Sequence, residues 1–323
     1  MLLQVDNDAP LPTVDPAFRN DVLTGLARFP KAIPARWFYD HRGSELFEEI
    51  TRLPEYYPTR TERAILEAAA PEIAALTGSG RTVVEFGSGS SAKTPLLLSA
   101  VSPSAYVPID ISGQFLRESC AELAALFPNL PILPVEGDFT QPLLLPAGPA
   151  PRLGFFPGST LGNFLAPAAV DLLRAMANTL GANAQLLIGL DRLKSPEILI
   201  PAYDDAQGVT AAFNLNLLHR INRELDGDID VDAFEHRAVW NDEDCRVEMH
   251  LVAKAHRAAR VAGRVFIFNE GDTIHTENSL KYGPREARLL LWAVGWSPVA
   301  EWTDPQGAFA VILARAGSSA PAP

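Results

Sequence analysis

The chain has 323 residues, of which 47% are hydrophobic and 20% are charged, and its formal net charge is -12. This composition is typical of a globular protein of about two domains, at roughly 150 residues each. The negative charge argues against binding to phosphate backbones or to anionic membrane surfaces. We therefore expect a monomer that acts on a small molecule or a protein, with no nucleic-acid or membrane partner.

Cysteine and histidine give no sign of a metal centre. The cysteines are Cys120 and Cys245 only, and the six histidines show no H-E-x-x-H or paired spacing. We predict no metal and no disulfide framework. The first residues lack a basic segment followed by an apolar run, and no stretch approaches the ~18 apolar residues of a membrane span. We therefore expect the protein in the cytoplasm.

The first 60 residues mix prolines, aromatics and charges and contain a helical pattern at residues 44–52. A second helical pattern covers residues 60–78. Apolar runs of strand length then alternate with helical patterns such as 114–127 and 168–180. Such alternation predicts a doubly wound α/β fold that binds ligands at the carboxyl ends of its strands. The five expected strands cover residues 82–86, 106–111, 132–135, 153–156 and 186–190.

The alternation breaks between residues 194 and 282, where a long helical pattern precedes two strand-like runs. We interpret this insert, together with residues 15–60, as an α+β substrate-binding lobe that covers the active edge of the sheet. The sheet pattern resumes with a helix and a last strand. We assign residues 61–193 and 283–318 to a Rossmann-like cofactor-binding domain, and residues 1–14 and 319–323 to flexible termini.

The stretch VVEFGSGSSAKT, residues 83–94, comes close to three nucleotide-binding signatures. Gly87, Gly89 and Ala92 fit the G-x-G-x-x-G/A turn of a dinucleotide fold, and the Ala-Lys-Thr at the end is one residue short of a phosphate loop. An apolar run that ends in an acid before G-x-G also suits the first motif of an S-adenosylmethionine (SAM) methyltransferase. The phosphate loop is disfavoured, because Ala92 adds a side chain where backbone amides must wrap a phosphate.

Acidic residues after the strands help to choose between the other two signatures. Asp110 ends the second strand, where an acid can bind the ribose of either cofactor. Glu85 would repel a pyrophosphate but suits the cationic sulfonium and ammonium groups of SAM. Asp138 and Phe139 follow the third strand, where they can bond the adenine amino group and cover its ring. The predicted SAM-binding residues are Glu85, Gly87, Gly89, Asp110, Asp138 and Phe139.

Polar residues on the expected substrate side leave alternatives open. Asn163, in the loop after the fourth strand, could hold a carboxylate or an amine, or it could cap the next helix. Glu277 and Ser279 would point the same way on an extended strand. They could read an imidazole or another N–H pair, or they could be surface residues. Three tyrosines could either bind substrate or only pack, namely Tyr39, Tyr56 and Tyr203.

Over nearly its whole length, from about Asp21, the chain resembles the L-histidine Nα-methyltransferases of ergothioneine biosynthesis. Several of the segments that carry the likeness are long and lie outside the generic methyltransferase pattern, so the match is specific. The first 20 residues are the weaker part of the likeness. The segments are RWFYDHRGSELFEEITRLPEYYPTRTE, VVEFGSGSSAKT, VPIDIS, EGDF, GSTLGNF, AYDDAQGVTAAFN, DAFEHRAVWN, VEMHL and TENSLKY.

The resemblance implies SAM as the cofactor and a pocket for histidine. In the family, an Asn amide and a Tyr hydroxyl hold the α-amino acid group, while a Glu and a Ser bind the imidazole. One departure is Ala92, where family members carry a Glu, and it would tune cofactor affinity at most. The cofactor contacts of the family fall on Tyr39, Gly87, Lys93, Asp110, Asp138 and Phe139. Its substrate contacts fall on Tyr56, Asn163, Tyr203, Met249, Glu277 and Ser279.

The implied reaction is a direct displacement in which the α-amine attacks the sulfonium methyl group in line, three times, to give hercynine. The enzyme contributes position and desolvation, with Tyr39, Tyr56 and Asn163 as catalytic residues. The amine must first lose a proton to a tyrosine, a water or bulk solvent. The faces of Tyr39 and Tyr56 would tolerate the growing quaternary cation. The alternatives are a methyltransferase on another amino acid, an NAD-binding oxidoreductase and a non-catalytic SAM-binding module.

Overall fold

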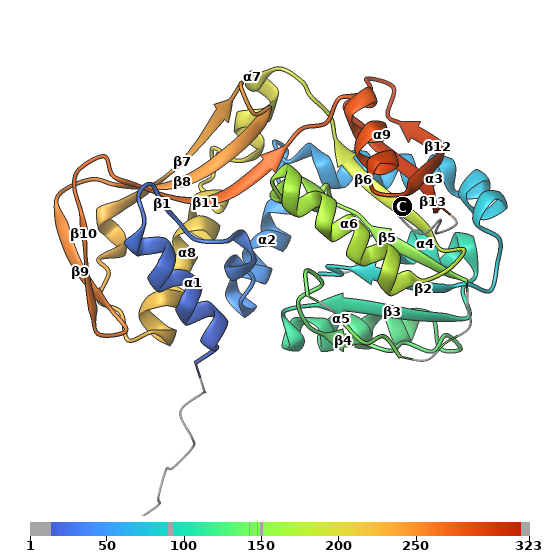
Figure 1. Ribbon diagram of the computed structural model, residues 1–323, viewed down its shortest axis with the longest axis horizontal. Helices are drawn as coiled ribbons and strands as arrows, with labels where there is room; N and C mark the ends of the chain where they lie inside the picture. Colours follow the sequence, from blue (N-terminus) through green and yellow to red (C-terminus); the bar gives the residue numbers. More distant parts are fainter. Residues whose placement is uncertain (1–13, 90–92, 142, 147, 149–150, 318–323) are drawn as a thin grey trace, which may run out of the picture.

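The computed structural model describes residues 14–89, 93–141, 143–146, 148 and 151–317. It contains a seven-stranded sheet, here called the central sheet, and a four-stranded sheet, here called the lobe sheet. Figure 1 shows the central sheet on the right and the lobe sheet on the left, with α2 and α6 between them. The predicted flexible termini lie almost entirely outside the described residues.

The strands of the central sheet run in the order β12-β13-β6-β5-β2-β3-β4. The strands from β2 to β6 are parallel, whereas β13 is antiparallel to both of its neighbours. The order reverses between β2 and β5, and the carboxyl ends of parallel strands form a ligand crevice at such a point. The strands are β2 (Thr82–Phe86), β3 (Ala105–Asp110), β4 (Val135–Glu136), β5 (Arg152–Phe156), β6 (Gln185–Asp191), β12 (Trp296–Thr303) and β13 (Phe309–Ala316).

Helices cover both faces of the central sheet. Val84 and Phe156 join the core beneath α6 and α9, whereas their neighbours Val83 and Phe155 join the core beneath α3, α4 and α5. This alternation follows from the strand period of two residues. The predicted doubly wound α/β fold is therefore confirmed. The helices are α3 (Tyr57–Thr77), α4 (Thr94–Val101), α5 (Gly113–Leu126), α6 (Ala166–Leu180) and α9 (Pro284–Ala293).

The lobe sheet has the order β1-β11-β8-β7, with β7, β8 and β11 antiparallel and β1 parallel to β11. Phe213 and Leu217 on α8 pack against this sheet, and Phe18 and Phe38 near the start of the chain join the same core. The strands are β1 (Lys31–Ala32), β7 (Phe234–Asn241), β8 (Arg246–Ala253) and β11 (Thr273–Leu280), and the hairpin β9 (Arg257–Val261) and β10 (Arg264–Phe268) lies beside them. The α-helices are α1 (Pro16–Ala27), α2 (His41–Thr51), α7 (Pro196–Leu199) and α8 (Val209–Glu224), and the 3-10 helices are η1 (Ala35–Phe38), η3 (Ile200–Ala202) and η4 (Val231–Ala233).

Some elements differ from those expected. The strand expected at residues 132–135 is reduced to the short β4, and Ile132 makes only one isolated bridge to Tyr106. The helix α1 and the strands β7, β9 and β12 were not predicted. β12 contains Pro298 and lacks a continuous apolar run, so its sequence pattern is weak. The domain boundaries stay predictions. Within the described part of the chain, no helix combines the length and apolar character that a membrane span needs.

The loop after β5 packs closely on the lobe sheet. It forms the 3-10 helix η2 (Thr160–Asn163). A Cβ atom added at Gly162 would lie 2.8 Å from the carbonyl oxygen of Leu280, at the end of β11. Only glycine permits this approach, which brings Asn163 to the side of β11.

We expect Gly162→Ala to lower the free energy of unfolding by about 1–3 kcal/mol, because the extra atom forces η2 away from β11. Urea unfolding followed by circular dichroism measures this change. A variant as stable as the parent protein would contradict the close packing of η2 on β11.

Candidate active site

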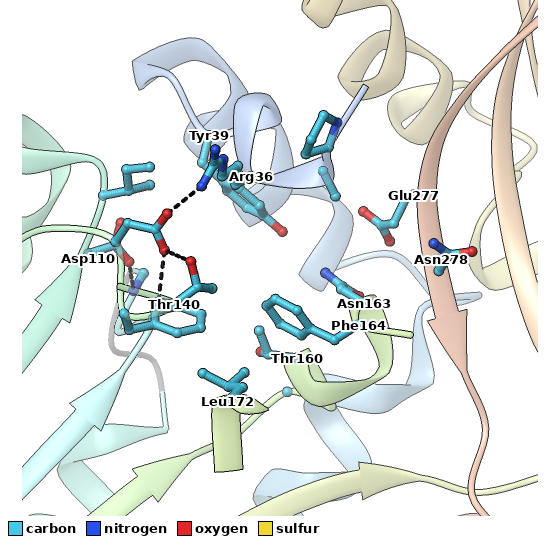
Figure 2. Close-up of a pocket in the computed structure, with 18 of the residues that line it drawn as sticks. Arg36, Tyr39, Asp110, Thr140, Thr160, Asn163, Phe164, Leu172, Glu277 and Asn278 are labelled. Atoms are coloured by element: carbon cyan, nitrogen blue, oxygen red, sulfur yellow. Dashed lines mark hydrogen bonds and ion pairs between the residues drawn. The ribbon is translucent and has the colours of Figure 1, made fainter. Parts of the chain in front are cut away.

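A cavity of about 1160 Å³ lies between the carboxyl ends of the central strands and the lobe sheet. Figure 2 shows Asp110 and Thr140 at one end of this cavity, and Asn163 and Glu277 at the other. Ligand pockets usually measure about 300–1,000 Å³, so there is room for a cofactor and a small substrate together. The end near Asp110 is called the cofactor end below, and the end near Glu277 the β11 end.

The glycine-rich turn after β2 lines the cofactor end. Gly87 and Gly89 have positive φ angles of 73° and 50°, which favour glycine. A Cβ atom at Gly87 would also lie 3.2 Å from the ring of Phe139. The carboxylate of Asp110 accepts hydrogen bonds from the backbone N–H groups of Gly89 and Ser112, both at 2.9 Å. A carboxylate at the end of β3 that is oriented by backbone N–H groups suits the ribose hydroxyls of a nucleoside cofactor.

Glu85 lies at the floor of the cavity and is more deeply buried than its place in the motif suggested. Its carboxylate accepts hydrogen bonds from the hydroxyls of Thr94 and Tyr106, both at 2.7 Å. Burial raises the pKa of Glu85 to about 7, although these hydrogen bonds oppose the rise. Glu85 therefore carries less negative charge at neutral pH than the sequence analysis assumed when it favoured SAM over a pyrophosphate cofactor. Ala92, on which the phosphate-loop comparison depended, lies outside the described residues.

Lys93 also lines the cavity, but a buried acid holds its ammonium group. Its Nζ lies 2.5 Å from a carboxylate oxygen of Glu62, and the N–H of Gly158 donates to the same oxygen at 2.8 Å. Glu62 is fully buried, and the missing side chain of Gly189 leaves room for its other oxygen. Reasoning from the sequence missed Glu62. A signal was present, since an acid three residues before Ile65 falls on the apolar face of a predicted helix.

Asp138 is bound to the segment before α2 rather than standing free. One of its oxygens accepts hydrogen bonds from the N–H and the hydroxyl of Thr140, at 2.9 and 2.6 Å. The other lies 2.6 Å from the guanidinium of Arg36 in η1. Arg36 also pairs with Asp21 at 2.7 Å. Arg36 was another residue that sequence reasoning missed, although it lies in a segment that carries the family likeness. This ion pair fastens the start of the chain to the cofactor end.

At the β11 end, Glu277 lies against the cavity among aromatic side chains. In the part of the chain that the structure describes, no group donates a hydrogen bond to its carboxylate, and burial raises its pKa to about 7. The alternative of a surface residue is therefore wrong. Tyr39 and Tyr56 also line the cavity, and burial raises the pKa of both phenols well above the usual value. Both tyrosines therefore remain neutral hydroxyls at any pH near 7.

Asn163 faces the cavity from η2, beside Glu277 (Figure 2). The helix that follows, α6, begins after Leu165 and has no side-chain cap. The alternative that Asn163 caps this helix is therefore wrong. Its amide has both a donor and an acceptor group to offer a ligand.

Three further predicted residues are buried next to the cavity rather than in its lining. Met249 pairs directly with Glu277 across β8 and β11. The ring of Tyr203 packs edge-on against that of Tyr56, with 6.3 Å between centroids, and its hydroxyl lies 2.6 Å from Ser279 Oγ. Because Ser279 is only 4% exposed, the alternative of a surface residue is wrong for it too.

One cluster in the lobe sheet has the side chains of a metal site. Ligand atoms of Glu248, His250 and His275 lie within 4.8 Å of one another. Arg246 pairs with the carboxylate of Glu248 at 2.6 Å, and the two imidazole rings are stacked. The guanidinium already occupies the acid that a cation would need. The absence of a metal stays a prediction.

The chemistry of the cofactor end fits SAM. Asp110 can bind ribose hydroxyls, and Asp138 can bind an adenine amino group. Both acids line the cavity together with the aromatic ring of Phe139. Asp110 keeps this end acidic, because none of the ion pairs among the described residues neutralises its carboxylate, and an acid here suits the ribose of SAM.

Comparison with known proteins also indicates a SAM-dependent enzyme. The family model described as "Histidine-specific methyltransferase, SAM-dependent" matches residues 18–316. The chain is 42% identical to the histidine N-alpha-methyltransferase of Mycolicibacterium smegmatis, over 97% of this chain and 99% of that protein. It is 31% identical to ergothioneine biosynthesis protein 1 of Neurospora crassa, over 85% of this chain but 32% of that longer protein.

Among solved structures, a SAM-dependent methyltransferase from Clostridium acetobutylicum superposes with a TM-score of 0.51 at 10% identity, over 85% of this chain and 99% of that one. This likeness supports the fold alone. The family match covers most of the chain, and the cavity has the acids and glycines that such an enzyme needs. The chain therefore belongs to the family of SAM-dependent, histidine-specific methyltransferases.

Proposed function

We propose that the protein transfers three methyl groups from SAM to the α-amine of L-histidine and makes hercynine, a step of ergothioneine biosynthesis. The observation that carries this proposal is the carboxylate of Glu277. It lines the cavity and accepts no hydrogen bond from any described residue. Such a group would bind the N–H of an imidazole. The names of the relatives support the same substrate. We also propose a cytoplasmic monomer that uses no metal and binds neither nucleic acid nor membrane.

In this proposal SAM occupies the cofactor end. Asp110 binds the ribose, and Asp138 and Phe139 hold the adenine, while Tyr39, Glu85, Lys93 and the two glycines complete the site. When bound, SAM supplies an electrophilic methyl group. The chain's own residues provide the position of the nucleophile and exclude water from the cavity.

Histidine occupies the β11 end. Glu277 and Ser279 hold the imidazole, with Met249 beneath it, and Asn163, Tyr56 and Tyr203 hold the α-amino acid group. Since Tyr39 and Tyr56 stay neutral, they orient the amine by hydrogen bonds and do not remove its proton as phenolates. Their ring faces can also accommodate a methylated cation that no longer donates hydrogen bonds.

Mass spectrometry of L-histidine incubated with the protein and SAM tests the proposal. We expect products with one, two and three added methyl groups, and the trimethylated product at the end of the reaction. If SAM binds by calorimetry but no methylated histidine forms, another amino acid is the substrate. Binding of NAD in place of SAM would point to an oxidoreductase.

Replacing Glu277 by Ala should raise the KM for histidine roughly 10–100-fold, because a charge-assisted hydrogen bond is worth about 1.5–3 kcal/mol. The KM for SAM should change little. Steady-state kinetics with each substrate varied in turn measures both values. Glu270→Ala, at an exposed turn before β11, is the matched control. Equal effects of Glu277→Ala on the two KM values would rule out its contact with imidazole.

The KM for histidine should also depend on pH through Glu277. Burial raises its pKa to about 7, so the carboxylate dominates above this pH and the neutral acid below it. The KM should therefore rise as the pH falls from 8 to 6. Glu277→Gln should lack this component, whereas the titration of histidine itself is common to both proteins. Identical pH profiles for the two proteins would contradict the assignment.

Arg36→Gln should weaken SAM binding about two- to fivefold, because a partly exposed ion pair contributes up to about 1 kcal/mol. The loss should appear in the dissociation constant for SAM and not in the KM for histidine. Calorimetry of SAM binding measures it. Arg42→Gln, in an exposed pair on α2, is the control. Unchanged SAM affinity in Arg36→Gln would separate η1 from the cofactor site.

A further inference from the structure

Behind the β11 end lies a buried ion pair that the proposed reaction does not use. Lys281 follows β11 directly, and its Nζ lies 2.8 Å from a carboxylate oxygen of Asp191, the last residue of β6. Neither side chain has any exposed surface. Asp191 also binds Lys194 at 2.6 Å and accepts a hydrogen bond of 2.6 Å from the hydroxyl of Tyr57. Burial alone would raise the pKa of Asp191, but the two lysines lower it below its usual value, so this acid is a carboxylate.

The ammonium group of Lys281 has three hydrogens and no lone pair. Besides Asp191, it donates to the hydroxyl oxygen of Tyr203 and to that of Ser279, both at 2.8 Å. Its three hydrogens are therefore all in use. Both hydroxyl oxygens must act as acceptors toward Lys281, whatever else they do.

This constraint limits what Tyr203 and Ser279 can offer. The two hydroxyls lie 2.6 Å apart, and one donates to the other. The pair has two hydrogens in all, so one is left, and no described group accepts it. A buried hydroxyl hydrogen without an acceptor is costly, so a ligand that reaches past the cavity lining with an acceptor atom would be favoured here. Without Lys281, each oxygen would regain a lone pair and either hydrogen could rotate.

When Tyr203 donates to Ser279, the remaining hydrogen is on Ser279 Oγ, and β11 sets where Ser279 lies relative to Glu277. The β-bulge in β11 falls between His275 and Glu277, and the pairing with β8 is regular from there to Leu280. Glu277 and Ser279 therefore lie on the same face of the strand. An acceptor and a donor are side by side, two residues apart.

We propose that Lys281 is a specificity-determining positioning residue, which holds the Tyr203–Ser279 pair as a hydrogen-bond donor so that the site selects a neutral imidazole. The inference rests on the proposed function. A neutral imidazole has one N–H for Glu277 and one bare nitrogen that accepts the hydroxyl hydrogen. A ring that has an N–H but no acceptor nitrogen leaves that hydrogen unpaired, and sites of this kind reject such analogues strongly.

The test compares kcat/KM for L-histidine and for L-β-pyrrolylalanine, whose ring has an N–H and no acceptor nitrogen. The parent protein should prefer histidine strongly, and Lys281→Met should reduce this preference at least tenfold. Lys254→Met, at an exposed lysine, should leave the preference unchanged. An equal loss for both substrates in Lys281→Met would overturn the inference.

A double-mutant cycle separates this role from general support of the fold. If Lys281 acts through the hydroxyl pair, Lys281→Met should add little to the loss of preference already caused by Ser279→Ala. Fully additive effects would overturn the inference. If Lys281→Met does not fold, Lys281→Gln replaces it. The single variants Ser279→Ala and Tyr203→Phe then test the hydroxyl pair directly, and an unchanged preference in both variants would also overturn the inference. A parent protein that fails to methylate histidine would instead refute the proposed function.

Discussion

The buried ion pair between Asp191 and Lys281 joins the end of β6 in the central sheet to the end of β11 in the lobe sheet. The chain leaves the central sheet after Asp191 and returns at Tyr282, whose N–H donates to the carbonyl oxygen of Asp191 at 3.0 Å. Both ends of the insert therefore meet at one point. Burying two charges is costly unless each has further hydrogen bonds, and here Asp191 and Lys281 both do. Removing Asp191 would leave the buried ammonium group of Lys281 without its carboxylate partner.

The shape of the cavity follows from this junction. Because β11 returns to the central sheet there, its end packs closely on η2, and Glu277 and Asn163 lie side by side at one end of the cavity. At the opposite end, the ion pair of Arg36 with Asp138 joins η1 to the loop after β4. The cavity is thus enclosed by contacts between segments that are far apart in the chain.

Most of the strands of the central sheet could be predicted from the sequence, although β12 was missed and the strand at 132–135 is only the short β4. Parallel strands that end at one edge bring their last residues together, so Asp110 and Asp138 were expected at the same cavity, and both line it. Glu277 and Ser279 could be singled out by alternation alone, although their surroundings could not.

Long-range partners were beyond the reach of the sequence patterns. Glu62 lies 31 positions from Lys93, and Arg36 lies 102 positions from Asp138. No local period reports such contacts. The state of Glu85 was also misjudged, since its pKa depends on burial that only the packed structure reveals. Tyr203 and Ser279 were predicted as substrate contacts, but their link to Lys281 gives them a defined hydrogen-bonding role that residue types alone do not show.

A crystal structure with L-histidine and S-adenosylhomocysteine bound together tests the account most directly. We expect the imidazole within hydrogen-bonding distance of the Glu277 carboxylate and the Ser279 hydroxyl, and the α-amine turned toward the cofactor end of the cavity. An imidazole bound near Arg36, or an α-amine bound to Glu277, would contradict the assignment of the two ends and the substrate proposed from it.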